Sequence, residues 1–185
     1  MPARNAEATR TRILDAALAE FADRGFAGGR VDRVARAAET NVRMIYAYFG
    51  GKDALFDAAL TSAIERMAAA VPPRPADLAA WAGDLFDFHG SDATTLRIAL
   101  WAQLERPEAA AEPLDDYLAK VSAVTGASPL DAVDVLTFVY SLAQAWYLTP
   151  IGLLLSADGR DPRDPARVAA HREALVATVH RLTGK

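Results

Sequence analysis

The stretch that decides the fold runs VDRVARAAETNVRMIYAYFGGKDALF, from Val31 to Phe56. Its first apolar residues recur at steps of three and four and predict a helix of two turns over 31–38. A second short helix is predicted over 42–49, because Asn41 is a good N-cap and Ile45 with Phe49 forms an i, i+4 apolar pair. Two short helices joined by three or four residues are typical of a helix-turn-helix.

The second of these helices carries the side chains that would read DNA. A short helix held against another can project its N-terminal residues at base edges in the major groove. The outward residues near its start are Val42, Arg43, Met44 and Ala47. Arg43 is the residue among them able to make a bidentate contact to guanine. Donors of the kind that bind phosphates surround this surface: Arg30, Arg33, Tyr46, Tyr48 and Lys52.

Outward from this stretch, the whole chain is predicted to be all-α, with about nine helices and no alternating run that would indicate a strand. A longer helix from Glu7 to about Arg24 precedes the motif, with Gly25 ending it in a left-handed conformation. Another begins at Lys52 and ends before the stiff connector PPRP. Beyond it, each predicted helix is followed by Pro or Gly. Ser128 is expected to cap a further helix with Pro129 as its first residue.

Composition sets the broad class of protein. The 185 residues are 52% apolar and 24% charged, which is ordinary for a globular chain and excludes a disordered one. There is no cysteine, so disulfides, thiolate metal sites and cysteine nucleophiles are excluded. The first twelve residues hold no apolar run of the kind an export signal needs, and the expected location is the cytoplasm.

The net charge of −4 conceals an asymmetry between the two ends of the chain. Residues 1–55 contain nine Lys/Arg against seven Asp/Glu, whereas residues 56–185 contain eleven against seventeen. The basic end is therefore the end expected to meet a polyanion. Arginines that merely decorate solvated helix faces would give the same weak bias.

Four motifs resemble the N-terminal domain of the tetracycline-repressor (TetR) family of bacterial transcriptional regulators: T-R-x-x-I-L-x-A-A, F-x-x-x-G-F, V-x-x-V-A-x-A-A and I-Y-A-Y-F-G-G-K-D-A-L-F. The resemblance implies a DNA-binding domain over 1–51, a connector helix over 52–71, and an effector-binding and dimerisation domain over 72–185. It also implies a homodimeric repressor that a small effector releases from a palindromic operator. By position it assigns Tyr46, Tyr48 and Lys52 to phosphates.

The chain departs from the family pattern in three places. Gly29-Arg30 stands where the family commonly has a Thr or Ser cap before the second helix. Glu39 stands where a turn Gly is usual, and Tyr48 replaces a common His. The acidic Glu39 and the weak basic charge leave open an alternative, a helical ligand-binding or adaptor protein without sequence-specific DNA binding.

One segment, Val135 to Ala157, has 23 residues without a charge, long enough to cross a bilayer. Its polar residues and its flanking Asp134 and Asp158 favour instead a helix buried by its own domain and by a partner chain, broken or kinked at Thr149-Pro150. A membrane-anchored helical protein remains a third alternative. Two surfaces are predicted for dimerisation: the segment Val135 to Leu155 and a last-helix face made of Val168, Leu175, Val179 and Leu182.

Aromatic and amide side chains gather in the second half of the chain, as a pocket for an apolar or aromatic effector would need. The predicted effector residues are Trp81, Phe88, Trp101, Gln103, Tyr140, Gln144 and Tyr147. The three His lack the spacing of a helical zinc pair, and carboxylate pairs such as Asp115-Asp116 lie on amphipathic helices. We therefore expect no metal, no cofactor and no enzymatic activity.

Overall fold

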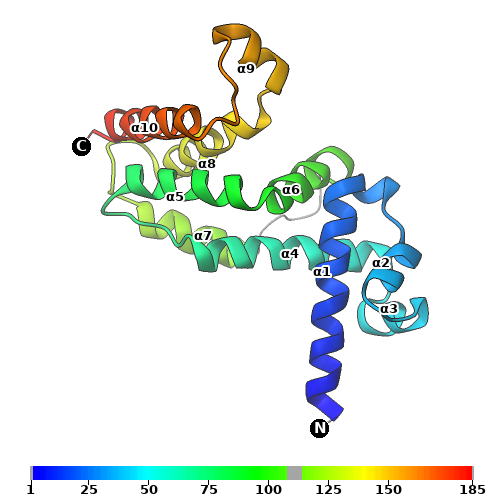
Figure 1. The fold of residues 1–185 in the computed structure, drawn as a ribbon. Coiled ribbons are helices and arrows are strands. Elements are labelled where there is room, and N and C mark those ends of the chain that lie inside the picture. Colours follow the sequence, from blue (N-terminus) through cyan, green and yellow to red (C-terminus); the bar gives the residue numbers. More distant parts are fainter. Residues whose placement is uncertain (1, 108–113, 185) are drawn as a thin grey trace. The chain divides into compact units, whose positions relative to one another are not determined.

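The computed structural model describes residues 2–107 and 114–184, and the elements found there are ten α-helices and no strand (Figure 1). The all-α prediction is confirmed. The helices are α1 (Pro2–Gly28), α2 (Val31–Ala37), α3 (Val42–Phe49), α4 (Lys52–Ala70), α5 (Leu78–Ser91), α6 (Ala93–Glu105), α7 (Leu114–Val124), α8 (Ala132–Leu148), α9 (Ile151–Asp158) and α10 (Pro165–Leu182).

The tenth helix results from the predicted break in the apolar segment. Pro150 supplies no N–H to continue α8, and α9 starts at the next residue at an angle of 81° to α8. The start of α8 differs from the prediction. Ser128 closes a turn, its Oγ accepting from the Leu130 amide at 3.2 Å, so the helix begins after Asp131 rather than at Pro129.

The chain packs as two compact units. Unit 1 comprises Met1–Met67 and Ala93–Leu114, and unit 2 comprises Ala68–Asp92 and Asp115–Lys185. Helix α4 therefore begins in unit 1 and ends in unit 2. The boundaries predicted from sequence, at 51 and 71, stay a prediction. The packing also places α6 against α1 in unit 1, although residues 50–92 separate α6 from the helix-turn-helix.

The core of unit 1 is built around an aromatic cluster. Phe56 of α4 meets Phe21 and Phe26 of α1 edge to face, with ring centroids 5.0 and 5.4 Å apart. Arg106 stacks its guanidinium over Phe26, 4.8 Å from the ring centroid. Ile45 of α3 is fully buried in the same core. The two short helices are thus anchored by burying their inward side chains on α1 and α4.

Two glycines allow the chain to pass close to this cluster. Gly25 breaks α1 as predicted, with φ 70° and ψ −179°, and a Cβ there would lie 2.8 Å from the Trp101 ring. A Cβ on Gly29 would lie 2.5 Å from the Phe21 ring. The absence of a Thr or Ser at position 29 therefore has a packing reason: the space beside the N-terminus of α2 is filled by Phe21.

Unit 2 is organised on α5, which packs against both α8 and α10. Trp81 of α5 is fully buried, meets the Tyr140 ring edge-on at 5.5 Å, and donates its indole N–H to the Val71 carbonyl. Leu175 and Val179 of α10 are also buried in this core. The prediction that Leu175 and Val179 contact a partner chain is therefore wrong, because unit 2 already covers both side chains.

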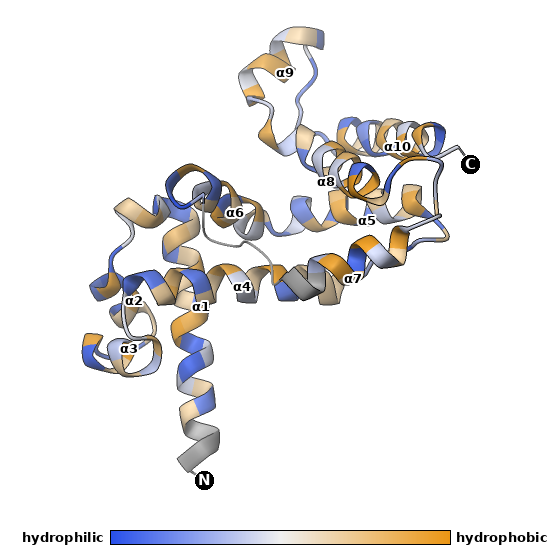
Figure 2. Ribbon diagram, turned by 180° about the vertical axis from the view of Figure 1, so that it is seen from behind, coloured by the Kyte–Doolittle hydropathy of each residue, from blue (hydrophilic) through white to orange (hydrophobic). Residues whose placement is uncertain are grey.

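Among the described residues, no single helix is long and apolar enough to cross a membrane, and α8 with α9 passes that test only as a bent pair. The buried side of α8, including Val135 and Val139, faces the core of unit 2. In contrast, none of the residues of α9 is buried, although much of the helix is hydrophobic (Figure 2).

Candidate nucleic-acid interface

Helix α3 has the local structure that its sequence predicts. The Asn41 side chain accepts a hydrogen bond from the Met44 amide at 3.0 Å and caps the N-terminus. Gly50 ends the helix with φ 82°, a left-handed conformation that favours glycine. These two caps fix both ends of an eight-residue helix, which would be too short to be stable alone.

The two sides of α3 are distinct. Ile45 is buried and Phe49 packs against the core, whereas Val42, Arg43, Tyr46 and Ala47 are exposed and Met44 is half-buried. The structure thus brings the predicted groove-reading side chains together on one outward side. An exposed arginine in the first turn of a projecting helix has the geometry for bidentate contact to a guanine edge.

The candidate phosphate donors fall into two groups. Tyr46 is 51% exposed and Arg30 is exposed, so both can reach a ligand. Tyr48 is half-buried against the core. Lys52 holds its ammonium 4.7 Å from the Phe26 ring centroid and donates to the Ala27 carbonyl at 3.4 Å, so its side chain is oriented by unit 1.

Arg33 is occupied within unit 1. Its Nε donates to the Glu20 carboxylate at 2.7 Å and its Nη2 to the Gly28 carbonyl at 2.7 Å. Glu20 also accepts from the Arg30 amide at 2.9 Å. Burial opposes ionisation of Glu20, but these hydrogen bonds and the positive charge of Arg33 lower the pKa of Glu20 below its usual value. The role of Arg33 as a phosphate contact stays a prediction.

Sequence reasoning missed two residues near this surface. Glu20 ties the entry of α2 to α1, and it belongs to no motif that would have marked it. Arg10 is exposed on α1 and stacks its guanidinium 5.3 Å from the Phe49 ring centroid. Since Phe49 ends α3, Arg10 adds a cation beside the predicted reading helix. Two signals pointed to it: Arg10 is the arginine of the T-R-x-x-I-L-x-A-A motif, and arginine is in excess in the first 55 residues.

Glu39 adopts φ 50° in the turn between α2 and α3, the left-handed conformation that glycine adopts without strain. We expect Glu39→Gly to stabilise unit 1 by about 1 kcal/mol, the strain of a left-handed non-glycine residue less the entropic cost of glycine. The variant should also bind DNA more tightly, since a negative charge in the turn before the predicted reading helix is lost. Thermal unfolding and fluorescence anisotropy with duplex DNA measure both effects.

Glu39→Gln is the matched control, because it removes the charge and keeps the strained backbone. It should reproduce the gain in DNA affinity without the gain in stability. Equal melting temperatures for the glycine and glutamine variants would show that the turn stores no strain.

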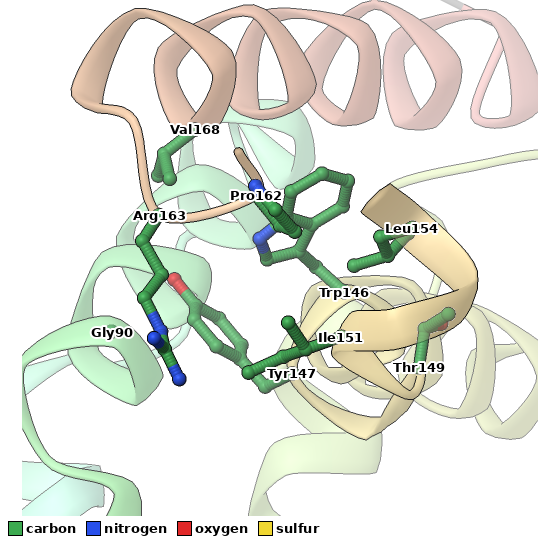
Figure 3. Close-up of a pocket in the computed structure, with 9 residues that line it drawn as sticks. All are labelled: Gly90, Trp146, Tyr147, Thr149, Ile151, Leu154, Pro162, Arg163 and Val168. Atoms are coloured by element: carbon green, nitrogen blue, oxygen red, sulfur yellow. The ribbon is translucent and has the colours of Figure 1, made fainter. Parts of the chain in front are cut away.

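The predicted effector residues are divided between the two units. Trp101 and Gln103 lie on α6 in unit 1, where Trp101 packs beside Gly25 and Gln103 is exposed. The other five lie in unit 2 and are Trp81, Phe88, Tyr140, Gln144 and Tyr147. Tyr147 lines a pocket there (Figure 3). The set as a whole stays a prediction.

Two histidines of unit 2, His89 and His171, are shielded from solvent to different degrees. His89 of α5 is 1% exposed, and neither ring nitrogen has a hydrogen-bond partner among the residues that the structure describes. Burial lowers the pKa of His89, so the neutral ring is favoured there. His171 stacks on Trp146 with centroids 4.4 Å apart, and burial together with the charge of Arg167 lowers its pKa as well. Within the described residues, no group of three potential metal ligands occurs.

Two family models match this chain. The first, bacterial regulatory proteins of the tetR family, matches residues 13–59, and the second, the tetracyclin repressor-like C-terminal domain, matches residues 77–181. Together they cover the helix-turn-helix and most of unit 2.

Individual proteins are also similar to this chain. The HTH-type transcriptional repressor SCO4008 of Streptomyces coelicolor is 36% identical over 190 residues, covering 93% of this chain and 98% of its own. The crystal structure of the transcriptional regulator SCO4942 of the same organism has 34% identity and a TM-score of 0.79, covering 94% of this chain and 97% of its own. The multidrug binding protein EbrR, crystallised with imidazole, has 25% identity and a TM-score of 0.53, covering 91% of this chain and 88% of its own.

A helix-turn-helix carried on an all-helical chain defines a DNA-binding regulator. The chain belongs to the TetR family of bacterial transcriptional regulators.

Proposed function

We propose that this regulator is a homodimeric repressor that binds a palindromic operator through α3 and is released by a small effector. The observation that carries the DNA-reading part is the outward side of α3, where Arg43 stands exposed at the start of a helix capped by Asn41. The repressor role is supported by the name of the relative SCO4008. Acting on chromosomal DNA would place the protein in the bacterial cytoplasm.

Base reading and phosphate binding should separate by mutation. We expect Arg43→Ala to cost about 1–3 kcal/mol on the cognate operator and little on random duplex, because a bidentate guanine contact carries sequence information. Lys52→Ala should weaken binding to all duplexes alike and reduce the slope of log K against log salt concentration by about one, since one phosphate contact is lost. Anisotropy titrations at several salt concentrations measure both.

Arg36→Ala is the control for charge alone, because Arg36 is exposed on α2 and outside the predicted contact set. Its effect should be smaller than that of either variant. Equal losses on cognate and random DNA for Arg43→Ala would reject a base-reading role for that residue.

A dimer surface is proposed between α8 and α10 of unit 2. A groove there is lined by the exposed Ala145 and Ala174 and by the half-buried Leu142, His171 and Thr178, together with Leu175, which unit 2 already covers. Ala145 and Ala174 are exposed, so helices of a second copy can approach closely. Two-fold pairing of this surface would bring two copies of α3 into one molecule, as a palindrome with two half-sites requires.

Effector release is proposed to act through α4, which begins after α3 and ends in unit 2. For a hundredfold loss of operator affinity, the effector must bind the DNA-free form about 2.7 kcal/mol more tightly than the DNA-bound form. By linkage, saturating operator must weaken effector binding by the same hundredfold factor. Effector affinity that is equal with and without operator would reject this mechanism.

A second candidate function is a helical ligand-binding protein without sequence-specific DNA binding. The single observation that favours it is Glu39, an exposed acid in the turn of the helix-turn-helix. Equal affinity for every duplex tested would favour this alternative.

A further inference from the structure

The pocket in unit 2 has a lining that points to a particular ligand chemistry (Figure 3). It encloses about 350 Å³, within the range of small-molecule sites. The end of α8, helix α9 and the segment leading into α10 form most of its wall, and Gly90 of α5 contributes one side. The lining residues are Gly90, Trp146, Tyr147, Thr149, Ile151, Leu154, Pro162, Arg163 and Val168. Most of this wall is aromatic or aliphatic.

Arg163 is the charged member of the lining, and its residue is exposed. The neighbouring arginines are engaged: Arg160 and Arg167 both pair with Asp158, at 2.7 and 3.2 Å. In the part of the chain that the structure describes, the Arg163 guanidinium forms no ion pair with a carboxylate within 4 Å. Its backbone amide, not its guanidinium, bonds Asp161.

The other nearby acids are also committed. Asp164 caps α10 by accepting from the amides of Ala166 and Arg167. Asp87 of α5 holds Arg172 at 2.8 Å. The guanidinium of Arg163 therefore remains available as a charged, fork-shaped donor set at the pocket.

A second donor lies in the same wall. Trp146 is 7% exposed, and no residue within 2–107 or 114–184 accepts a hydrogen bond from its indole N–H. Figure 3 places the indole nitrogen on the ring edge toward Tyr147.

The pocket hydroxyls are bonded already. Tyr147 donates to the Phe86 carbonyl at 3.0 Å and Thr149 to the Ala145 carbonyl at 2.8 Å. Burial raises the pKa of Tyr147 to about 12, so its hydroxyl stays protonated and adds no negative charge to the pocket. The groups left to recognise a ligand are thus donors beside an apolar wall.

We propose that this pocket binds a small organic acid with a flat apolar ring, its carboxylate meeting Arg163 and the Trp146 N–H, and its ring packing against Ile151 and Leu154. The inference rests on the proposed effector function in one respect, that such an acid would be the effector. A cationic ligand is disfavoured by Arg163. A neutral ring of the same size would gain only the apolar contacts.

Isothermal titration calorimetry of the full chain with three naphthalene probes tests this proposal. The probes are naphthalene-2-carboxylate, naphthalene-2-carboxamide and 2-(aminomethyl)naphthalene, which share one ring and differ in charge. The carboxylate should bind at least tenfold more tightly than the carboxamide, and the amine most weakly. Arg163→Gln should remove the tenfold preference for the carboxylate and leave carboxamide affinity unchanged.

Arg181→Gln is the matched control, because Arg181 is exposed on α10 of the same unit and lies outside the pocket lining. It should keep the full preference for the carboxylate. Leu154→Trp, which fills the pocket from α9, should weaken the carboxylate and carboxamide alike by at least tenfold, with far-ultraviolet circular dichroism showing that the helices are retained.

The possible outcomes distinguish a failure of the proposed binding site from a failure of the proposed effector function. Equal carboxylate affinity in the wild type and Arg163→Gln, a preference for the amine, or no binding of any probe at millimolar concentration would overturn the proposal. Operator binding is measured on the same preparations. Carboxylate binding that depends on Arg163 but leaves operator affinity unchanged would keep the site and reject its role as the effector site.

Discussion

Phe56→Ala is expected to destabilise unit 1 by about 3–5 kcal/mol, the cost of emptying the centre of an aromatic core. Phe56 is fully buried and makes edge-to-face contacts with both Phe21 and Phe26. Its removal leaves a cavity where α1 and α4 meet. Because Ile45 packs into the same core, the position of α3 should loosen as well, and DNA affinity should fall together with stability.

Urea unfolding followed by circular dichroism measures the loss, with Phe138→Ala as the control. Phe138 is 43% exposed on α8 in unit 2, so its truncation should cost below about 1 kcal/mol. Phe56→Leu should recover most of the stability by refilling the cavity. A loss under 1 kcal/mol for Phe56→Ala would mean that the aromatic cluster does not hold unit 1 together.

Ala145→Arg is expected to convert the dimer to a monomer and to weaken operator binding by about a hundredfold. Ala145 is exposed at the groove between α8 and α10, where a long charged side chain would separate two approaching helices and leave a charge buried at the interface. A monomer presents one α3 and loses the second half-site. Folding of unit 2 should be unaffected, since the new side chain starts at its surface.

Analytical ultracentrifugation at micromolar concentration and operator titration measure these two effects. Ala119→Arg, an equivalent substitution at an exposed position of α7, should remain dimeric. A dimer that survives Ala145→Arg with full operator affinity would place the interface elsewhere on the chain.

Local patterns in the sequence predicted the helix-turn-helix closely, and the reason is physical. Asn41, Ile45 and Gly50 act through capping, burial and backbone conformation within a few residues of each other. Such effects leave their signature in neighbouring positions. The break at Thr149-Pro150 was predictable for the same reason, because a missing N–H is a property of one residue.

Long-range packing was not predictable from these patterns. Leu175 and Val179 form an apolar stripe that suits a partner chain as well as a core, and only the contact with α5 shows which of the two covers it. Likewise, α6 joins unit 1 through Arg97, which donates to the Ala22 carbonyl at 2.8 Å across 75 positions of sequence. The bond between Glu20 and Arg33 also depends on how α1 meets α2.

Selection of bound duplexes from a random DNA pool, followed by titration of the enriched sequence with wild type and Arg43→Ala, tests the central claim most directly. The account predicts one enriched palindrome with half-sites one or more whole turns of DNA apart, and a preference over random duplex that falls by about 1–3 kcal/mol in Arg43→Ala. A pool without an enriched sequence, or an enriched palindrome bound equally well by Arg43→Ala, would contradict it.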